Sequence, residues 1–151
     1  MGIRTALFAR GPVRPPHAMN APMEIPAATA SWRDRDFAPL PGTELCDLEH
    51  VPDGGAREFN FGDGRDPFRL IVLRSGDSVW GYLNKCPHFG VPLNVEPDRF
   101  TLFEHSYLYC SVHCAMFRFE DGYCEDGPCT GDSLLRVPLT VEHGRVCIAT
   151  E

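Results

Sequence analysis

The apolar and polar positions of the chain alternate in short runs, and turns rich in glycine separate these runs. Residues 56–61 alternate with a period of two, which is typical of a half-buried strand. Residues 68–73 are mostly apolar, as in a buried strand, and residues 79–83 follow them after a tight turn at residues 75–77. The pattern therefore predicts an antiparallel hairpin near the middle of the chain.

Short apolar segments predict the remaining strands, at residues 45–46, 107–109, 117–119, 135–139 and 146–148. Pro138 favours an edge position for its strand, because proline cannot donate a hydrogen bond to a ladder. No stretch keeps a helical period for more than one or two turns. The expected fold class is therefore all-β.

Residues 1–40 show neither the strand period nor the helix period. Prolines are scattered there among alanine, methionine and arginine, and such a stretch cannot bury enough apolar surface to offset its ordering entropy. We therefore expect a flexible Pro/Ala-rich arm at residues 1–40 and one domain at residues 41–151. Trp32 and Phe37 are expected to dock part of the arm on this domain.

The two parts of the chain differ in charge. Residues 1–40 hold five arginines against three acidic residues, whereas residues 41–151 hold nine basic against eighteen acidic residues, and the sum is the net charge of −7. Such an acidic domain excludes nucleic acid as a partner, because the phosphate backbone repels it. It suits a fast, salt-sensitive encounter with a basic protein, although acidity also serves solubility alone.

The sequence contains no apolar run long enough to span a membrane, so no membrane association is expected. Its first residues lack the apolar region of a secretory signal and the paired arginines of a twin-Arg signal. We therefore expect a cytoplasmic protein. Its seven cysteines then indicate metal ligands and reduced, packed thiols instead of disulfides.

Two short motifs each pair one thiol with one imidazole. One residue separates Cys86 from His88, and two residues separate Cys110 from His113. Thiolate and imidazole ligands select zinc or iron–sulfur clusters over hard cations. Ligands this close in sequence reach one centre only from a tight loop, because neighbouring side chains on a strand point to opposite faces. The motifs therefore predict a metal site with two cysteine and two histidine ligands.

The order of these ligands along the chain helps to distinguish zinc from an iron–sulfur cluster. Zinc fingers usually present two cysteines from one knuckle and two histidines from another, whereas the two residue types alternate here. Alternation suits a binuclear centre in which two cysteines hold one iron and two histidines hold the other. Together with the downstream pair Gly127-Pro128, these motifs are similar to those of the Rieske family of [2Fe–2S] proteins.

The resemblance implies a Rieske-type [2Fe–2S] cluster with Cys86, His88, Cys110 and His113 as its ligands. It also implies a Rieske-type fold of stacked antiparallel sheets with a small cluster-binding subdomain, here at about residues 84–130. A third loop with Gly127-Pro128 would close over the cluster, and the histidines would lie at an exposed tip. The apolar residues around this tip would either contact a partner or only shield the cluster: Phe89, Pro92, Leu93, Met116 and Pro128.

Departures from the high-potential members of the family imply a low reduction potential. Val91 and Val112 stand at the positions of the disulfide found in those members, and Ala115 and Phe117 at the positions of two hydroxyl donors to the cluster. Loss of these donors destabilises the reduced cluster. Cys114 stands where the family usually has glycine, so its backbone is strained if that position needs a positive φ.

Three cysteines near the C-terminus, Cys124, Cys129 and Cys147, lie outside the two motifs. They are expected to be buried as small hydrophobic residues, and the alternative is a second metal site. The remaining histidines are expected at the surface or in turns: His17, His50, His105 and His143.

No nucleophile–base pair and no nucleotide-binding glycine loop is evident, so we expect no catalytic residues. The leading hypothesis is an electron carrier, not itself an enzyme, that passes one electron from a reductase to an oxygenase or another terminal oxidoreductase. One alternative is a permanent Rieske subunit of a larger oxidoreductase. The other is a zinc-stabilised interaction module without a redox function.

Overall fold

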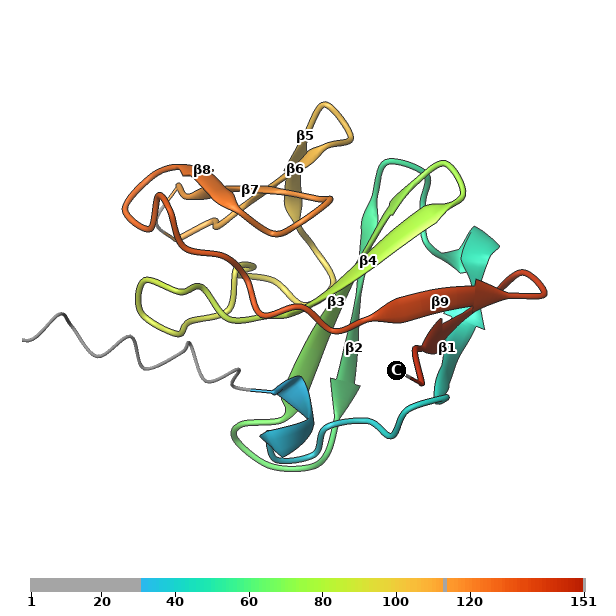
Figure 1. Ribbon diagram of the computed structural model, residues 1–151. Coiled ribbons are helices and arrows are strands. Elements are labelled where there is room, and N and C mark those ends of the chain that lie inside the picture. The colour runs from blue at the N-terminus through green and yellow to red at the C-terminus, as the bar shows by residue number, and fades with distance from the viewer. Residues whose placement is uncertain (1–30, 113, 151) are drawn as a thin grey trace, which may run out of the picture.

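The computed structural model describes residues 31–112 and 114–150, which form three small antiparallel sheets (Figure 1). The first sheet, in the order β1-β10-β9, consists of β1 (Glu44–Asp47), β10 (Arg145–Ile148) and β9 (Leu139–Glu142). The second, in the order β2-β3-β4, consists of β2 (Ala56–Phe61), β3 (Phe68–Ser75) and β4 (Ser78–Leu83). The third, in the order β5-β6-β7-β8, consists of β5 (Thr101–Phe103), β6 (Tyr107–Tyr109), β7 (Met116–Arg118) and β8 (Cys124–Asp126).

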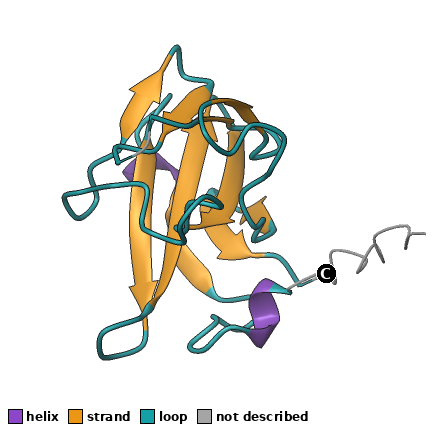
Figure 2. Ribbon diagram, turned by 90° about the vertical axis from the view of Figure 1, so that its left-hand side faces the viewer, coloured by secondary structure: helices purple, strands orange, loops and turns teal. Residues whose placement is uncertain are grey.

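Helix in the described residues is limited to two 3-10 turns, η1 (Trp32–Asp34) and η2 (Leu48–His50) (Figure 2). No helix in this part of the chain has the length and apolar character needed to cross a membrane. The all-β class is thereby confirmed. The predicted central hairpin is also found, as β3 and β4 with Ser75 opposite Ser78.

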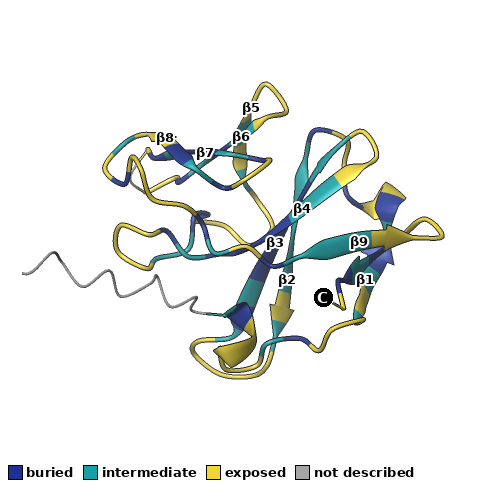
Figure 3. Cartoon of the chain, viewed as in Figure 1, coloured by how far each residue is buried: buried dark blue, intermediate teal, exposed yellow. Residues whose placement is uncertain are grey.

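Strand β3 contributes side chains to two separate hydrophobic cores. Ile71 and Leu73 pack into an upper core with the third sheet, whereas Leu70 and Val72 pack into a lower core with the first sheet. Successive side chains on a strand point to opposite faces, so one strand can serve both cores. Figure 3 accordingly shows β3 as mostly buried ribbon in the middle of the molecule.

Tyr82 of β4 joins the second sheet to the third. Its ring is completely buried in the upper core, and its hydroxyl donates a hydrogen bond of 2.6 Å to the carbonyl oxygen of Phe119. A buried tyrosine hydroxyl needs such a partner. Burial also raises the pKa of Tyr82, so the hydroxyl keeps its proton and remains a donor.

The prediction of a strand at residues 135–139 is wrong. Only Leu139 enters a strand, β9, and the preceding residues form one isolated bridge, between Arg136 and Tyr82. The physical reason is Pro138, which has no N–H to continue a ladder. The short strands β5 and β8 are not predicted by the sequence pattern.

Trp32 is buried in the lower core, where its ring meets that of Phe68 edge-on at 6.4 Å between centroids. This confirms the expected docking of Trp32. The ring of Phe37 lies against Gly62, although about half of its surface is exposed. The division of the chain at residue 40 remains a prediction, and residues 1–30 lie outside the described part.

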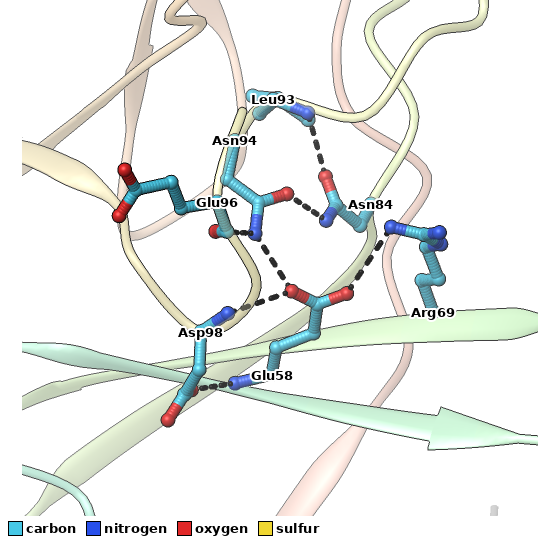
Figure 4. A network of polar contacts seen from close by, with 7 residues as sticks. All are labelled: Glu58, Arg69, Asn84, Leu93, Asn94, Glu96 and Asp98. Atoms are coloured by element: carbon cyan, nitrogen blue, oxygen red, sulfur yellow. Dashed lines mark hydrogen bonds and ion pairs between the residues drawn. The ribbon is translucent and has the colours of Figure 1, made fainter.

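A buried polar network connects β2 to the loop that follows β4 (Figure 4). The Glu58 side chain on β2 is only 2% exposed, and Arg69 lies 3.6 Å from its Oε1. Its Oε2 accepts hydrogen bonds from the Asn94 amide at 2.7 Å and from the Asp98 N–H at 3.2 Å. In return, the N–H of Glu58 donates to the carboxylate of Asp98 at 2.7 Å. The exposed stretch after Asn94 is thus held against the sheet.

The network continues through Asn84, the residue directly after β4. The amide of Asn84 donates to Asn94 Oδ1, and its oxygen accepts from the N–H of Leu93, both at 2.7 Å. The carbonyl of Leu93 in turn accepts from the N–H of Ser111, which lies in the second predicted ligand loop. The network therefore fixes both predicted ligand loops to the body of the domain.

We predict that Asn84→Ala destabilises the protein by about 2–4 kcal/mol, because it deprives two buried polar groups of their partner. Urea unfolding would measure the change in free energy. The matched control is Asn60→Ala, because Asn60 is exposed on β2 and this change should stay within about 0.5 kcal/mol of wild type. Equal effects of the two substitutions would contradict the role given to the network.

Candidate metal centre

The first predicted ligand loop is closed by two backbone hydrogen bonds. The N–H of Cys86 donates to the carbonyl of Val91, and the N–H of Gly90 donates to the carbonyl of Cys86, each at 2.7 Å. Gly90 has a φ of +68°, a conformation that glycine adopts without steric cost. This closure turns the loop tightly enough for Cys86 and His88 to lie in the same turn.

The second predicted loop repeats this pattern residue for residue. The N–H of Cys110 donates to the carbonyl of Ala115 at 2.8 Å, and the N–H of Cys114 donates to the carbonyl of Cys110 at 2.9 Å. Cys114 therefore occupies the position that Gly90 holds in the first loop. Its φ is +55°, which confirms the expected requirement for a positive φ. A non-glycine residue there stores about 1 kcal/mol or more of strain.

The loops bury their thiols and expose an imidazole. Cys86 and Cys110 are each 1% exposed and belong to the upper core, whereas His88 is exposed at the surface. The ring of His88 lies 3.9 Å from that of Phe89 between centroids. His113, the fourth predicted ligand, lies outside the described residues.

Burial and three neighbouring residues, His88, Cys110 and Cys129, influence the pKa of the Cys86 thiol. Burial is the largest influence and raises the pKa of its thiol, while the N–H of His88, which donates toward the sulfur, opposes this rise. The thiol of Cys110 also lies within hydrogen-bonding reach and raises the pKa further. A soft metal centre bound at the two sulfurs would have to displace their protons, because thiolates are the ligands.

The third predicted loop packs directly on the second. A Cβ on Gly127 would lie 2.7 Å from the Cα of Ala115, which no side chain tolerates, and Gly127 has a φ of +104°. Only glycine fits this close approach of two backbones. The next side chains are Pro128, which is exposed, and Cys129, which is buried beside Cys86.

The apolar surface around the tip differs in part from the expected one. Phe89 is 68% exposed, and Pro92 and Met116 are half-buried, but Leu93 is fully buried and cannot contact a partner. Leu93 is buried because the backbone on both sides of its side chain is tied to Asn84 and Ser111. Val112, which was not among the apolar residues expected around the tip, is exposed.

The structure brings Cys86 and Cys110 together and carries His88 on the rim of the first loop. Among residues 31–112 and 114–150, no three His, Cys, Asp or Glu side chains form a group able to hold one metal ion. Cys124 and Cys129 are buried as expected, whereas Cys147 is partly exposed. His50, His105 and His143 lie at the surface, and His17 lies outside the described residues.

Several solved structures resemble this fold. The ferredoxin of carbazole 1,9a-dioxygenase from Nocardioides aromaticivorans IC177 has a TM-score of 0.60 and 21% identity over 74% of this chain and 99% of its own. A complex of reduced oxygenase and oxidized ferredoxin in carbazole 1,9a-dioxygenase has a TM-score of 0.57 and 27% identity, over 72% of this chain and 92% of the matched chain. The terminal oxygenase from the same Nocardioides strain has a TM-score of 0.60 and 19% identity, over 72% of this chain but 30% of its own.

A search of curated protein sequences gave no match. The family of the Rieske [2Fe-2S] domain, however, matches residues 43–141. This range covers most of the chain and includes both predicted ligand loops and the third loop. The chain therefore belongs to the Rieske [2Fe-2S] family, and its cofactor is a [2Fe–2S] cluster.

Proposed function

We propose that Cys86, His88, Cys110 and His113 hold the cluster. The observation that carries this proposal is the duplicated loop, in which the same pair of hydrogen bonds closes the turn after Cys86 and after Cys110. Two equivalent turns present two sulfurs side by side, and the imidazole of His88 follows on the exposed rim. This donor set of soft sulfur and imidazole fits iron in a Rieske centre.

The residues around the proposed ligands exclude water on one side only. The two sulfurs belong to the upper core, which also contains the completely buried side chains of Leu108 and Phe117. The histidine side of the site faces solvent at His88. When bound there, the cluster supplies one-electron chemistry, and the exposed side is the route to a partner protein. The burial of the sulfurs lowers the local dielectric and so influences the reduction potential.

We further propose that the protein carries one electron from a reductase to an oxygenase or another terminal oxidoreductase. Support comes from the extent of the structural similarity, which spans 99% of a dioxygenase ferredoxin but only 30% of an oxygenase chain. Related structures include complexes between an oxygenase and its ferredoxin. In this function the chain itself positions the redox centre and the docking surface and has no catalytic residue.

The proposed docking surface consists of Phe89 and Val112, one from each ligand loop. Their side chains are 68% and 52% exposed, and both stand next to a proposed histidine ligand in the sequence. An apolar patch around a redox centre suits a transient contact, because it excludes water without adding charge to the interface. Phe89 is the larger side chain and the better candidate for the main contact.

We predict that His88→Ala and His113→Ala each abolish the Rieske-type electron paramagnetic resonance signal. They should also lower the melting temperature, because cluster binding is coupled to folding. The control is His50→Ala, which removes an exposed imidazole outside the loops and should leave both properties unchanged. An intact signal in either ligand variant would refute the ligand assignment.

We predict a midpoint potential between about −150 and 0 mV, in the low part of the family range. Ala115→Ser should raise this midpoint, because it restores a hydroxyl at a position where high-potential relatives have a donor to the cluster. Ala149→Ser is the control, since Ala149 is also buried but lies beyond the last strand. Protein-film voltammetry at neutral pH would measure the midpoint potentials of wild type and both variants. A wild-type midpoint above about +150 mV would contradict the prediction.

We predict that Phe89→Ala slows electron delivery to the native acceptor about tenfold, which corresponds to a loss of about 1.4 kcal/mol at the contact. The midpoint potential should stay unchanged. Stopped-flow kinetics would measure the rate. Leu40→Ala is the control, because Leu40 is exposed before β1 and belongs to neither predicted ligand loop. Equal rates for wild type and Phe89→Ala would argue against docking through this residue.

A further inference from the structure

Two cysteines outside the proposed ligand set face each other beneath the third loop. The Sγ of Cys129 lies 3.2 Å from the Sγ of Cys124, within the distance of a sulfur hydrogen bond. Cys124 is fully buried and Cys129 is 3% exposed. A disulfide has an S–S distance of about 2.05 Å, so the two sulfurs need to approach by only about 1 Å to form a bond.

The backbone holds these two thiols in place. The N–H of Cys124 donates to the carbonyl of Asp132 at 2.8 Å, and the N–H of Gly131 donates to the carbonyl of Cys124 at 3.2 Å. Between them, the hydroxyl of Thr130 donates to the carbonyl of Gly127 at 2.7 Å and closes the turn. The chain thus leaves Cys124, reverses direction and returns beside it. The proximity of the sulfurs follows from this hairpin geometry.

We propose that Cys124 and Cys129 are a redox-responsive dithiol pair, and that their oxidation to a disulfide closes the third loop into a covalent ring. The oxidant in this reaction is a small-molecule disulfide of the glutathione class. Each of the two thiols loses one proton and one electron as the bond between their sulfurs forms. The S–S bond of the small disulfide breaks and takes up both electrons and both protons, which yields two small thiols.

Closure of this ring acts on the ligand loops through direct contacts. Gly127, which lies inside the ring, packs on the backbone of Ala115 in the second ligand loop. Cys129 lies beside Cys86 in the first. A cross-link between Cys124 and Cys129 restricts the movements that would lift the third loop from both of them. The protein that contains the Cys124–Cys129 disulfide should therefore release its cluster more slowly than the protein in which both thiols are free.

The reaction requires a brief opening of the loop. Both thiols are buried in the closed loop, where a small oxidant does not reach them. The loop surface is nevertheless exposed at Asp126, Pro128 and Thr130. Short exposed segments of this kind open locally at a small cost in free energy. Oxidation should consequently be slow and follow sustained exposure to the oxidant.

The first test counts thiols in the whole cluster-loaded protein. The protein is incubated without oxygen in the presence or absence of oxidised glutathione, then unfolded in acid, alkylated and mapped by mass spectrometry. Of the seven cysteines, Cys124 and Cys129 should become protected from alkylation and appear as one cross-linked peptide, lighter by two hydrogen atoms. Cys124→Ser should lose this cross-link, whereas Cys46→Ser, which removes a buried thiol of the lower core, should retain it.

Three results would overturn the dithiol pair. They are full alkylation of Cys124 and Cys129 after treatment, glutathione attached stably to either of them, and a cross-link that joins either one to Cys86 or Cys110. Each would show that the two sulfurs do not react with one another.

The second test measures the rate at which an iron chelator removes the cluster, followed by the loss of visible absorbance. Wild-type protein with the Cys124–Cys129 disulfide should lose its cluster several-fold more slowly than wild-type protein in which both thiols are free. In Cys124→Ser, treatment with the oxidant should make no difference. Equal rates for oxidised and reduced wild-type protein, once the cross-link is present, would overturn the stabilising role of the ring.

Discussion

The position of the two predicted ligand loops depends on the contacts of one buried group, the carboxylate of Glu58. A charge in a protein interior is costly unless hydrogen bonds or an ion pair compensate it. Oε2 of Glu58 accepts hydrogen bonds from Asn94 and from the backbone of Asp98, whereas Oε1 has no hydrogen-bond partner among the described residues. Arg69 adds an ion pair at 3.6 Å. Through Asn84 and the backbone of Leu93, the same network reaches both loops. The body of the domain therefore fixes the two loops that contain the proposed ligands.

Much of the site follows from local sequence signals. Cysteine and histidine at fixed short spacings indicate tight loops, and the pair Gly127-Pro128 indicates the third. The backbone strain at Cys114 was also predictable, because members of the Rieske family usually have glycine at that position. The alternation of residues 56–61 and the apolar run after it indicated the central hairpin correctly. These signals are local, so they can be recognised without knowledge of the fold.

What the sequence could not indicate depends on contacts between distant segments. Glu58 looks like one of many surface acids, and only the position of Asn94, 36 residues later, makes it a buried partner. Leu93 was expected around the exposed tip from the family resemblance, but its backbone is bonded to Asn84 and Ser111 and its side chain is buried in the core. The approach of Cys124 to Cys129 likewise depends on the return of the chain at Gly131. Such pairings have no periodicity for a sequence pattern to display.

The double role of β3 limits how this domain can be taken apart. Its side chains alternate between the core beneath the ligand loops and the core of the opposite half, so neither half has a complete interior without it. A designer who wished to graft the loops onto another scaffold would need to carry β3 and β4 along, together with a substitute for the lower core. The segment that contains the proposed ligands therefore depends on the rest of the domain and cannot be transferred alone.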